Sequence, residues 1–331
     1  MALRTWRFVP LATLAFLLLA SDAASPQGAD RPKRKIKYID IHTHVGTFYW
    51  GRELTAEGLI KFMDEHGIEK AVVLPLVSPE SCLFPQTTEA ALTAAKKYPD
   101  RLVPFCAVDP RANSGNPKRF GRIDGPGLVA LLKRYKEMGA RGFGEHQVGL
   151  PFDHPLMMEV YRACEKVGLP ILCHLDDIRG IDTPGLPRLE NALKTFPKLT
   201  FIGHAAGFWA SISADATSAD FGRYPKIPTP VVPGGALERL LAKYPNLYCD
   251  LSEPGGYAAI ARDRKFGREF ILRWTDRLLF GTDVLMSNQE IPQFKLFDSL
   301  DLPEDVQYKI YRGNAIRILK LEEPQRPGVR K

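Results

Sequence analysis

The chain has 331 residues, of which 45% are hydrophobic and 25% are charged. This composition is average for globular proteins and excludes a disordered, collagen-like or multi-span membrane protein. The formal net charge is +7, but part of the basic surplus lies near the two ends, and no basic stripe interleaved with aromatic residues recurs along the body. The sequence therefore predicts no nucleic-acid partner.

The first residues have the pattern of a secretory signal peptide. Arg4 and Arg7 give a positive start, Phe8–Ala20 is almost entirely apolar, and residues 21–23 (SDA) offer small side chains to a signal peptidase. The apolar run is shorter than the roughly 20 residues of a membrane-spanning helix. We expect a signal peptide over residues 1–23, a secreted or periplasmic protein, and no stable membrane span after cleavage; an uncleaved anchor is the alternative. Residues 24–36 then form a basic linker.

From Lys37 onward, short apolar runs alternate with segments of helical period. The expected helices include Thr55–His66, Glu89–Tyr98, Leu128–Met138, Pro155–Val167 and Ala236–Tyr244. The expected strands are Tyr38–His42, Ala71–Leu74, Leu102–Ala107, Gly142–Glu145, Pro170–His174, Thr200–His204, Leu247–Leu251 and Leu278–Asp283. Strands that alternate with helices predict βαβ units and a parallel sheet.

This number of units predicts an α/β fold, a (β/α)8 TIM barrel over residues 37–322 with a tail at 323–331. An open doubly wound sheet is the alternative. That fold usually places a glycine-rich phosphate loop after an early strand, whereas the first strand here ends in His42-Thr43-His44. Residues 208–233 are too long for a plain connection, and we expect them to form an insertion over the barrel mouth.

Ionisable side chains stand at the carboxyl ends of several expected strands, where barrel enzymes place their active sites. His42 and His44 are two residues apart and so share one face of a strand. His174, His204 and Asp283 end three later strands. Imidazole and carboxylate groups suit a divalent ion such as zinc and leave coordination positions for water or a small-molecule substrate.

The ordered motifs resemble the amidohydrolase superfamily. Within it they are most similar to the amidohydrolase-related branch (amidohydrolase 2, or aminocarboxymuconate-semialdehyde decarboxylase-like), which contains metal-dependent hydrolases and nonoxidative decarboxylases. The resemblance extends from about Tyr38 to Leu321. The motifs are Ile39-Asp40-Ile41-His42-Thr43-His44, Leu172-Cys173-His174, Ile202-Gly203-His204-Ala205-Ala206-Gly207, Phe280-Gly281-Thr282-Asp283 and the closing Gly313-Asn314-Ala315-Ile316-Arg317-Ile318-Leu319.

The resemblance implies a role for each matching residue. His42, His44, His174 and Asp283 correspond to metal ligands of the family, and Asp283 also to the base that takes a proton from water. His204 corresponds to a histidine that binds a second metal or polarises and protonates the substrate. The resemblance also implies one or two divalent ions, most often zinc, and a homodimer.

The fourth strand departs from the family pattern. Many family hydrolases carry a carboxylated lysine there that bridges two metals, whereas this chain has Glu145, which would bridge two ions as a carboxylate. If Glu145 points inward, strand alternation predicts that Phe143 does too. A single-ion site, with Glu145 beside the ligands or contacting substrate, is the alternative.

Two further residues are candidates for substrate binding. Arg52 lies after the first strand and can hold a carboxylate through two parallel hydrogen bonds, although a solvated arginine is the simpler interpretation. Trp209 follows His204 and is expected either to line the pocket or to pack beneath the insertion.

These residues leave three functions open. The leading hypothesis is a metal-dependent hydrolase that acts on a small molecule through a metal-activated water. The first alternative is a metal-dependent nonoxidative decarboxylase of an aromatic or unsaturated carboxylic acid, which the missing lysine and Arg52 favour. The second is a non-catalytic extracellular binding barrel, in which Asp283 would be dispensable.

Overall fold

The computed structural model describes residues 36–49, 51–112 and 125–322. All of them belong to one unit, Arg34–Lys331, and this unit alone is described below. The expected signal peptide, almost all of the basic linker and the C-terminal tail lie outside the described residues. Within the described ranges, none of the helices is both long and apolar enough to cross a membrane.

The strands of this unit run parallel around a common axis. They form a three-stranded sheet of order β1-β4-β5 and a five-stranded sheet of order β10-β9-β8-β7-β6. These strands are β1 (Tyr38–Thr43), β4 (Ile68–Val73), β5 (Leu102–Pro104), β6 (Phe143–His146), β7 (Ile171–His174), β8 (Phe201–His204), β9 (Leu247–Asp250) and β10 (Leu278–Leu279). A short antiparallel hairpin follows β1 and consists of β2 (Gly46–Tyr49) and β3 (Arg52–Leu54).

Single bridges join the two sheets into a closed barrel. Cys106 pairs with Phe143 on one side, and Thr43 pairs with Val284 on the other. The second junction also contains the Ile41 N–H, which donates to the Phe280 carbonyl at 3.0 Å. The predicted α/β fold, a (β/α)8 TIM barrel, is therefore confirmed.

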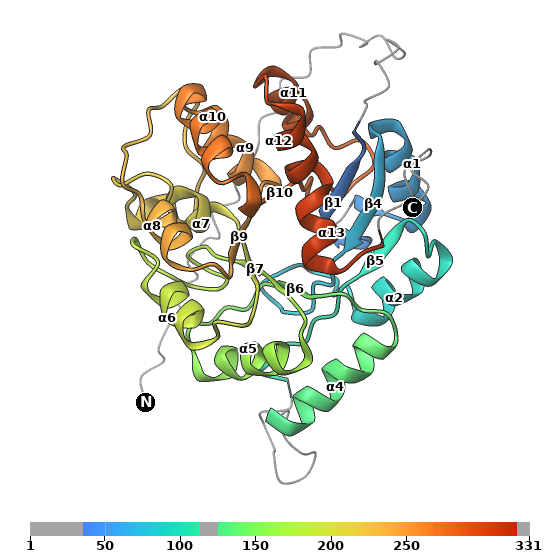
Figure 1. Cartoon of the computed structure of the whole chain (residues 1–331). Coiled ribbons are helices and arrows are strands. Elements are labelled where there is room, and N and C mark those ends of the chain that lie inside the picture. The colour runs from blue at the N-terminus through green and yellow to red at the C-terminus, as the bar shows by residue number, and fades with distance from the viewer. Residues whose placement is uncertain (1–35, 50, 113–124, 323–331) are drawn as a thin grey trace, which may run out of the picture. The chain divides into compact units, whose positions relative to one another are not determined.

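Helices lie around the outside of the strands, as Figure 1 shows for α2, α4, α5, α6 and α8. The helices are α1 (Ala56–His66), α2 (Thr88–Lys97), α4 (Gly125–Glu137), α5 (Pro155–Val167), α6 (Pro187–Thr195), α7 (Ala206–Ala210), α8 (Ala236–Lys243), α9 (Glu253–Ala261), α10 (Arg264–Arg273), α11 (Pro292–Ser299), α12 (Glu304–Tyr308) and α13 (Asn314–Leu319), with short helical turns η1 (Ser218–Asp220), η2 (Thr275–Arg277) and η3 (Lys309–Gly313). Local signals set their ends. In α1, the Thr55 hydroxyl accepts from the Gly58 N–H, and Gly67 ends the helix with a φ of 70°.

Two apolar layers stabilise the barrel. Inward side chains such as Ile41, Val103 and Leu172 fill its interior, and Ala315 and Leu319 of α13 pack against them. A second layer between strands and helices contains aromatic and aliphatic side chains from almost every βα unit. Burial of this apolar surface is the main stabilising contribution to such a fold.

The last strand is shorter than its apolar run predicts. It ends at Leu279 rather than Asp283, because the following residues leave regular strand geometry to close the barrel against β1. The Asp283 N–H donates to the His42 carbonyl at 2.8 Å, and Asp283 has a φ of 57°. This irregular segment brings Asp283 to the carboxyl end of β1.

Gly281 lies in this closing segment, where a side chain has no room. A Cβ at this position would lie 2.5 Å from Asp250 Oδ1 and 3.2 Å from His42 Cβ. We expect Gly281→Ala to lower the free energy of unfolding by about 1–3 kcal/mol, the usual cost of overpacking. Denaturant unfolding measures this. Gly58→Ala is the control, because Gly58 is helical and its nearest neighbours are side-chain ends at 3.2 Å; an equal loss in both variants would contradict the prediction.

Candidate metal centre

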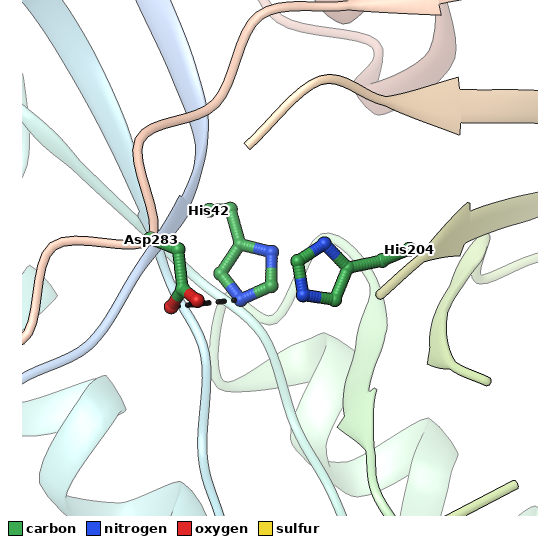
Figure 2. A group of neighbouring side chains, drawn as sticks. All are labelled: His42, His204 and Asp283. Carbon is green, nitrogen blue, oxygen red and sulfur yellow. Dashed lines mark ion pairs between the residues drawn. The ribbon is translucent and has the colours of Figure 1, made fainter. Parts of the chain in front are cut away.

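Four side chains from three parts of the barrel converge at its carboxyl end. His42 Nε2 lies 3.1 Å from His44 Nε2, 3.3 Å from Glu145 Oε2 and 3.4 Å from Asp283 Oδ1. His44 Nε2 lies 3.4 Å from Glu145 Oε2 and 3.3 Å from Asp283 Oδ1. The three residues other than Asp283 are fully buried, and the Asp283 side chain is 17% exposed. Figure 2 shows the ion pair between His42 and Asp283, with His204 beside them.

A second group of donor atoms shares the Glu145 carboxylate. Glu145 Oε1 lies 2.8 Å from His174 Nδ1 and 3.7 Å from His204 Nε2. One donor atom from each of these three residues lies within 4.8 Å of the donor atoms of the other two. The two oxygens of Glu145 thus face two different pairs of histidines, one at the end of β1 and one from β7 and β8.

Irregular hydrogen-bond register in two strands, β1 and β6, orients these side chains toward the cluster. In β1, Ile39 and Ile41 point into the barrel core, whereas His42 and the residue just after the strand, His44, face the cluster at its mouth. The register of β1 against β4 shifts between Asp40 and Thr43, which changes the alternation of side chains at this point. Such bulges occur at barrel rims and redirect side chains toward active sites.

The same effect makes one sequence expectation wrong. Phe143 does not point inward with Glu145: its ring packs 5.3 Å from that of His146, within the apolar layer between strands and helices. The register of β6 against β7 shifts between Phe143 and His146, and Gly144 has a φ of 130°. This left-handed region favours glycine, and the break in alternation turns Glu145 inward alone.

A buried carboxylate holds the outer nitrogens of two of the histidines. Asp250 Oδ2 lies 2.6 Å from His42 Nδ1 and 3.1 Å from His204 Nδ1. The Ser252 hydroxyl also donates to Asp250 Oδ2 at 2.8 Å. With the N–H of each ring on Nδ1, the Nε2 lone pairs of both rings face the cluster.

The other two histidines are held in a similar way. His44 Nδ1 donates to the Leu74 carbonyl at 2.9 Å. His174 is turned the other way round: its Nε2 lies 2.8 Å from Asp176 Oδ2, so its Nδ1 faces Glu145. Arg179 in turn donates to Asp176 Oδ2 from Nε at 3.0 Å. Acceptors of this kind fix the tautomer and ring orientation of metal-binding histidines.

Burial and opposite charge act against each other on these groups. Burial lowers the pKa of His42, but Asp283, Glu145 and Asp250 outweigh it and hold that pKa well above its usual value. For His174, burial is outweighed by hydrogen bonds with Asp176 and Glu145, which raise the pKa to about 9. The imidazoles in turn hold the carboxyl pKa values of Glu145 and Asp283 below normal, despite burial.

This donor set fits a divalent metal ion. Donor atoms bound tetrahedrally to one ion at 2.0–2.1 Å lie roughly 3.3–3.4 Å apart. The distances from His42 Nε2 to the other donor atoms, 3.1–3.4 Å, are close to this value. Imidazole nitrogens and carboxylate oxygens are ligands for zinc and related transition metals. The raised pKa values of His42 and His174 mean that these imidazoles hold protons in the absence of a metal. A bound cation would take the place of these protons.

The whole barrel matches a known family. The family model described as Amidohydrolase matches residues 39–321. The chain belongs to the amidohydrolase family. Together with the donor cluster, this membership indicates a metal-dependent enzyme.

Solved structures resemble this chain at low sequence identity. An uncharacterized TIM-barrel protein from Bordetella bronchiseptica is 18% identical, with a TM-score of 0.60, covering 86% of this chain and 99% of its own. A probable 2-pyrone-4,6-dicarboxylic acid hydrolase from Acinetobacter baumannii, solved with citric acid bound, is 16% identical, with a TM-score of 0.57 and coverage of 86% and 100%. A 5-carboxyvanillate decarboxylase from Novosphingobium aromaticivorans, complexed with manganese, is 16% identical, with a TM-score of 0.53 and coverage of 87% and 97%. These likenesses establish the fold. The search of curated proteins found no match.

The two candidate substrate residues lie outside the cluster. Trp209 is only 2% exposed, and its indole N–H donates to the Asp250 carbonyl at 2.9 Å, so it supports the segment behind the histidines. Arg52 is exposed and lines a cavity that also contains Glu253 and Thr282. Substrate contact by either residue stays a prediction.

Two acidic residues beside the cluster are not among the site residues predicted from the sequence. Asp250 ends β9 as a lone acid, and only the structure brings it to His42 and His204. Glu253 begins α9, and its Oε2 lies 3.7 Å from His204 Nε2. Their positions at and just after the carboxyl end of a barrel strand are the signal that could have found them.

A larger cavity, of about 920 Å³, lies at the opposite end of the barrel. Its lining includes Lys70, Leu102 and Arg141, which lie near the amino ends of β4, β5 and β6. Because it contains none of the clustered histidines, its size does not make it the site of chemistry.

Asp250 should control metal affinity without binding the metal itself. We expect Asp250→Asn to weaken metal binding about 10- to 100-fold, the usual effect of removing an acceptor behind a ligand. Chelator competition, read by metal analysis, measures the dissociation constant. Asp276→Asn is the control, because Asp276 is exposed and its carboxylate pairs with Lys309 at the surface; unchanged affinity in Asp250→Asn would contradict the role assigned to Asp250.

The raised pKa of His174 gives stability a defined pH dependence. In the metal-free protein, the stability contributed by this proton is complete below pH 6.5 and is lost as pH rises through about 9. The free energy of unfolding of the metal-free protein should therefore fall across this window. Metal binding requires deprotonated ligands, so the stabilisation by added metal should grow over the same window. Denaturant unfolding at several pH values, with and without metal, measures both trends; parallel curves would contradict this account.

Proposed function

We propose that the protein is a metal-dependent hydrolase that acts on a small molecule through an activated water. The observation that carries this proposal is the shared Glu145 carboxylate, whose two oxygens face separate histidine pairs. Paired-metal sites are typical of hydrolytic enzymes, in which two ions stabilise the attacking and leaving oxygens.

The residues that would hold the ions divide into two sets. His42, His44, Asp283 and Glu145 would hold one ion, and His174, His204 and Glu145 a second. We propose zinc as the metal, because it suits nitrogen and oxygen donors; manganese is the alternative, since the Novosphingobium decarboxylase was solved with it. When bound, the metal would act as a Lewis acid that lowers the pKa of water and polarises a substrate oxygen.

The chain supplies the proton transfers around this chemistry. The lowered pKa of Asp283 keeps it ionised at neutral pH, and its partial exposure lets water reach it. Asp283 is therefore placed to accept a proton from the attacking water. His204 presents Nε2 to the cluster, where it would hydrogen-bond a substrate oxygen if it is not occupied as a ligand. Such acid–base assistance is worth roughly 10²–10⁴-fold in rate.

A nonoxidative decarboxylase is the second candidate. The Novosphingobium enzyme supports it, as does the exposed guanidinium of Arg52, which can hold a carboxylate. In this reaction His204 or Asp283 would deliver a proton to the carbon that loses CO₂. The probable pyrone hydrolase from Acinetobacter supports hydrolysis instead.

The test compares products rather than rates alone. Metal-loaded protein is incubated in ¹⁸O-water with lactones, amides and aromatic carboxylic acids. Hydrolysis places ¹⁸O in the product, whereas decarboxylation releases CO₂ without label in the organic product. We expect label incorporation, and we expect Asp283→Asn to reduce turnover by about 10²–10⁴-fold because the proton acceptor is lost. Metal analysis of the same samples shows whether the variant still binds metal.

The outcomes separate the three functions. Unlabelled decarboxylated product would replace the hydrolase with the carboxy-lyase. Full turnover in metal-free protein would end both proposals. A purified protein whose every measurable function survives Asp283→Asn would support the non-catalytic binding barrel.

A further inference from the structure

A further cavity lies within the insertion, and its volume is about 390 Å³. Its lining comes from residues 210–229 and from Arg262, which follows the last residue of α9. This insertion cavity shares no lining residue with the metal-binding cluster or with the cavity that contains Arg52. An occupant would therefore lie outside the metal centre.

Arg262 places a buried cation in the wall of the insertion cavity. The residue is only 9% exposed. Its Nε donates to the Thr229 carbonyl at 3.0 Å, and its Nη2 donates to the Pro230 carbonyl at 2.8 Å. These carbonyls carry no net charge, and among the described residues the third nitrogen, Nη1, has no acceptor and the guanidinium has no carboxylate partner. A buried charge without an opposite charge is costly.

The other charged groups of the lining lie nearer the surface and partly cancel. Arg223 forms an ion pair with Asp220 at 3.2 Å. Lys226 is exposed and has no ion pair within the described ranges. Asp215 is exposed, and its Oδ1 accepts from the Ser213 hydroxyl at 2.5 Å. Three cations and two carboxylates leave the lining with a formal charge of +1.

The buried position of Arg262 decides which charge the cavity attracts. Charges at the surface are screened by salt, whereas a buried charge is screened much less. Arg262 therefore outweighs the exposed carboxylate of Asp215, and the exposed ammonium of Lys226 adds to its field. The insertion cavity consequently favours an anion.

A phosphate group matches these two cations. It carries a charge of about −1.5 to −2 near neutral pH and has three strong acceptor oxygens, so it can accept from Arg262 and Lys226 together. The cavity volume lies in the lower part of the roughly 300–1,000 Å³ range of small-molecule sites. Tyr224 also lines the cavity, and its hydroxyl already donates to Glu253, so it offers its ring to an organic part of the ligand.

We propose that the insertion cavity is a second ligand site, which binds a phosphate group through Arg262 and Lys226. The phosphate is either inorganic or part of a small organic molecule. This site goes beyond the proposed function, because it needs neither the metal nor the reaction at the metal centre.

Three ligands test the site directly. Isothermal titration measures binding of inorganic phosphate, phenylphosphonate and dimethyl phenylphosphonate to the metal-loaded protein. Phenylphosphonate replaces a phosphate ester because a hydrolase does not cleave its carbon–phosphorus bond, and its dimethyl ester keeps the ring but has no charge. We expect the anions to bind and the neutral ester not to bind. Tighter binding of phenylphosphonate than of phosphate would assign the site to a phosphorylated molecule, and equal binding to free phosphate. Absence of binding by both anions would overturn the inference.

Variants of opposite sign assign the binding to this cavity. Arg262→Gln should weaken phenylphosphonate binding about tenfold or more, because a charged hydrogen bond is lost. Lys226→Gln should weaken it about two- to fivefold, as is usual for an exposed ion pair. Asp215→Asn should strengthen it by a similar factor, since a repelling charge is removed while the amide oxygen still accepts from Ser213.

The surface variants keep the test valid even if Arg262→Gln does not fold. The side chains of Lys226 and Asp215 are exposed, so their replacement leaves the packing of the insertion intact. Lys166→Gln, at an exposed position of α5, is the charge-matched control for Lys226→Gln. Equal affinities in Lys226→Gln, Asp215→Asn and the control would refute the site.

Repeating the titration after removal of the metal separates the two sites. Phosphate is also a ligand for metal ions, so binding that requires metal and survives Arg262→Gln would place the anion at the metal centre and overturn the inference. Binding that falls in Arg262→Gln both with and without metal would support it. A hydrolase without the phosphate site would keep the proposed function and reject the second site, whereas a phosphate-binding protein without metal-dependent turnover would do the reverse.

Discussion

Every imidazole of the metal centre depends on a buried acceptor on the side away from the cluster. Asp250 is the acceptor for His42 and His204, Asp176 is the acceptor for His174, and the Leu74 carbonyl is the acceptor for His44. These bonds determine which nitrogen keeps its proton and which presents a lone pair. Because most of the acceptors come from other strands than the rings they hold, the ligand geometry is tied to correct closure of the barrel. The metal-binding geometry therefore forms only when the barrel is correctly folded.

The barrel orients these side chains by departing from regular strand geometry in β1, in β6 and after β10. Regular alternation would send His42 and Ile41 to opposite faces, yet Ile41 lies in the barrel core and His42 in the cluster above it. The register shifts in β1 and β6 allow one strand to serve both the core and the site. The irregular segment after β10 likewise places Asp283 beside His42 at the carboxyl end of the barrel.

Sequence alone predicts the parts of the molecule that depend on periodicity and position. The alternation of apolar runs and helices predicts the barrel, and the strand ends predict that His42, His44, His174, His204 and Asp283 meet, which they do. The inward turn of Glu145 without Phe143 is not predictable, because a register shift leaves no periodic signal. Asp250 and Glu253 are missed because a single acid at a strand end looks like any other. Their roles arise from partners on distant parts of the chain.

The floor of the barrel has a consequence for its synthesis on the ribosome. Ala315 and Leu319 of α13 pack against the interior side chains of strands that begin at Tyr38. An elongating chain thus carries inward-facing apolar strands for most of translation before their last covering element emerges. Exposed apolar strands in unfinished chains are prone to aggregation. The interior at this end of the barrel can therefore be covered only after α13 has been synthesised.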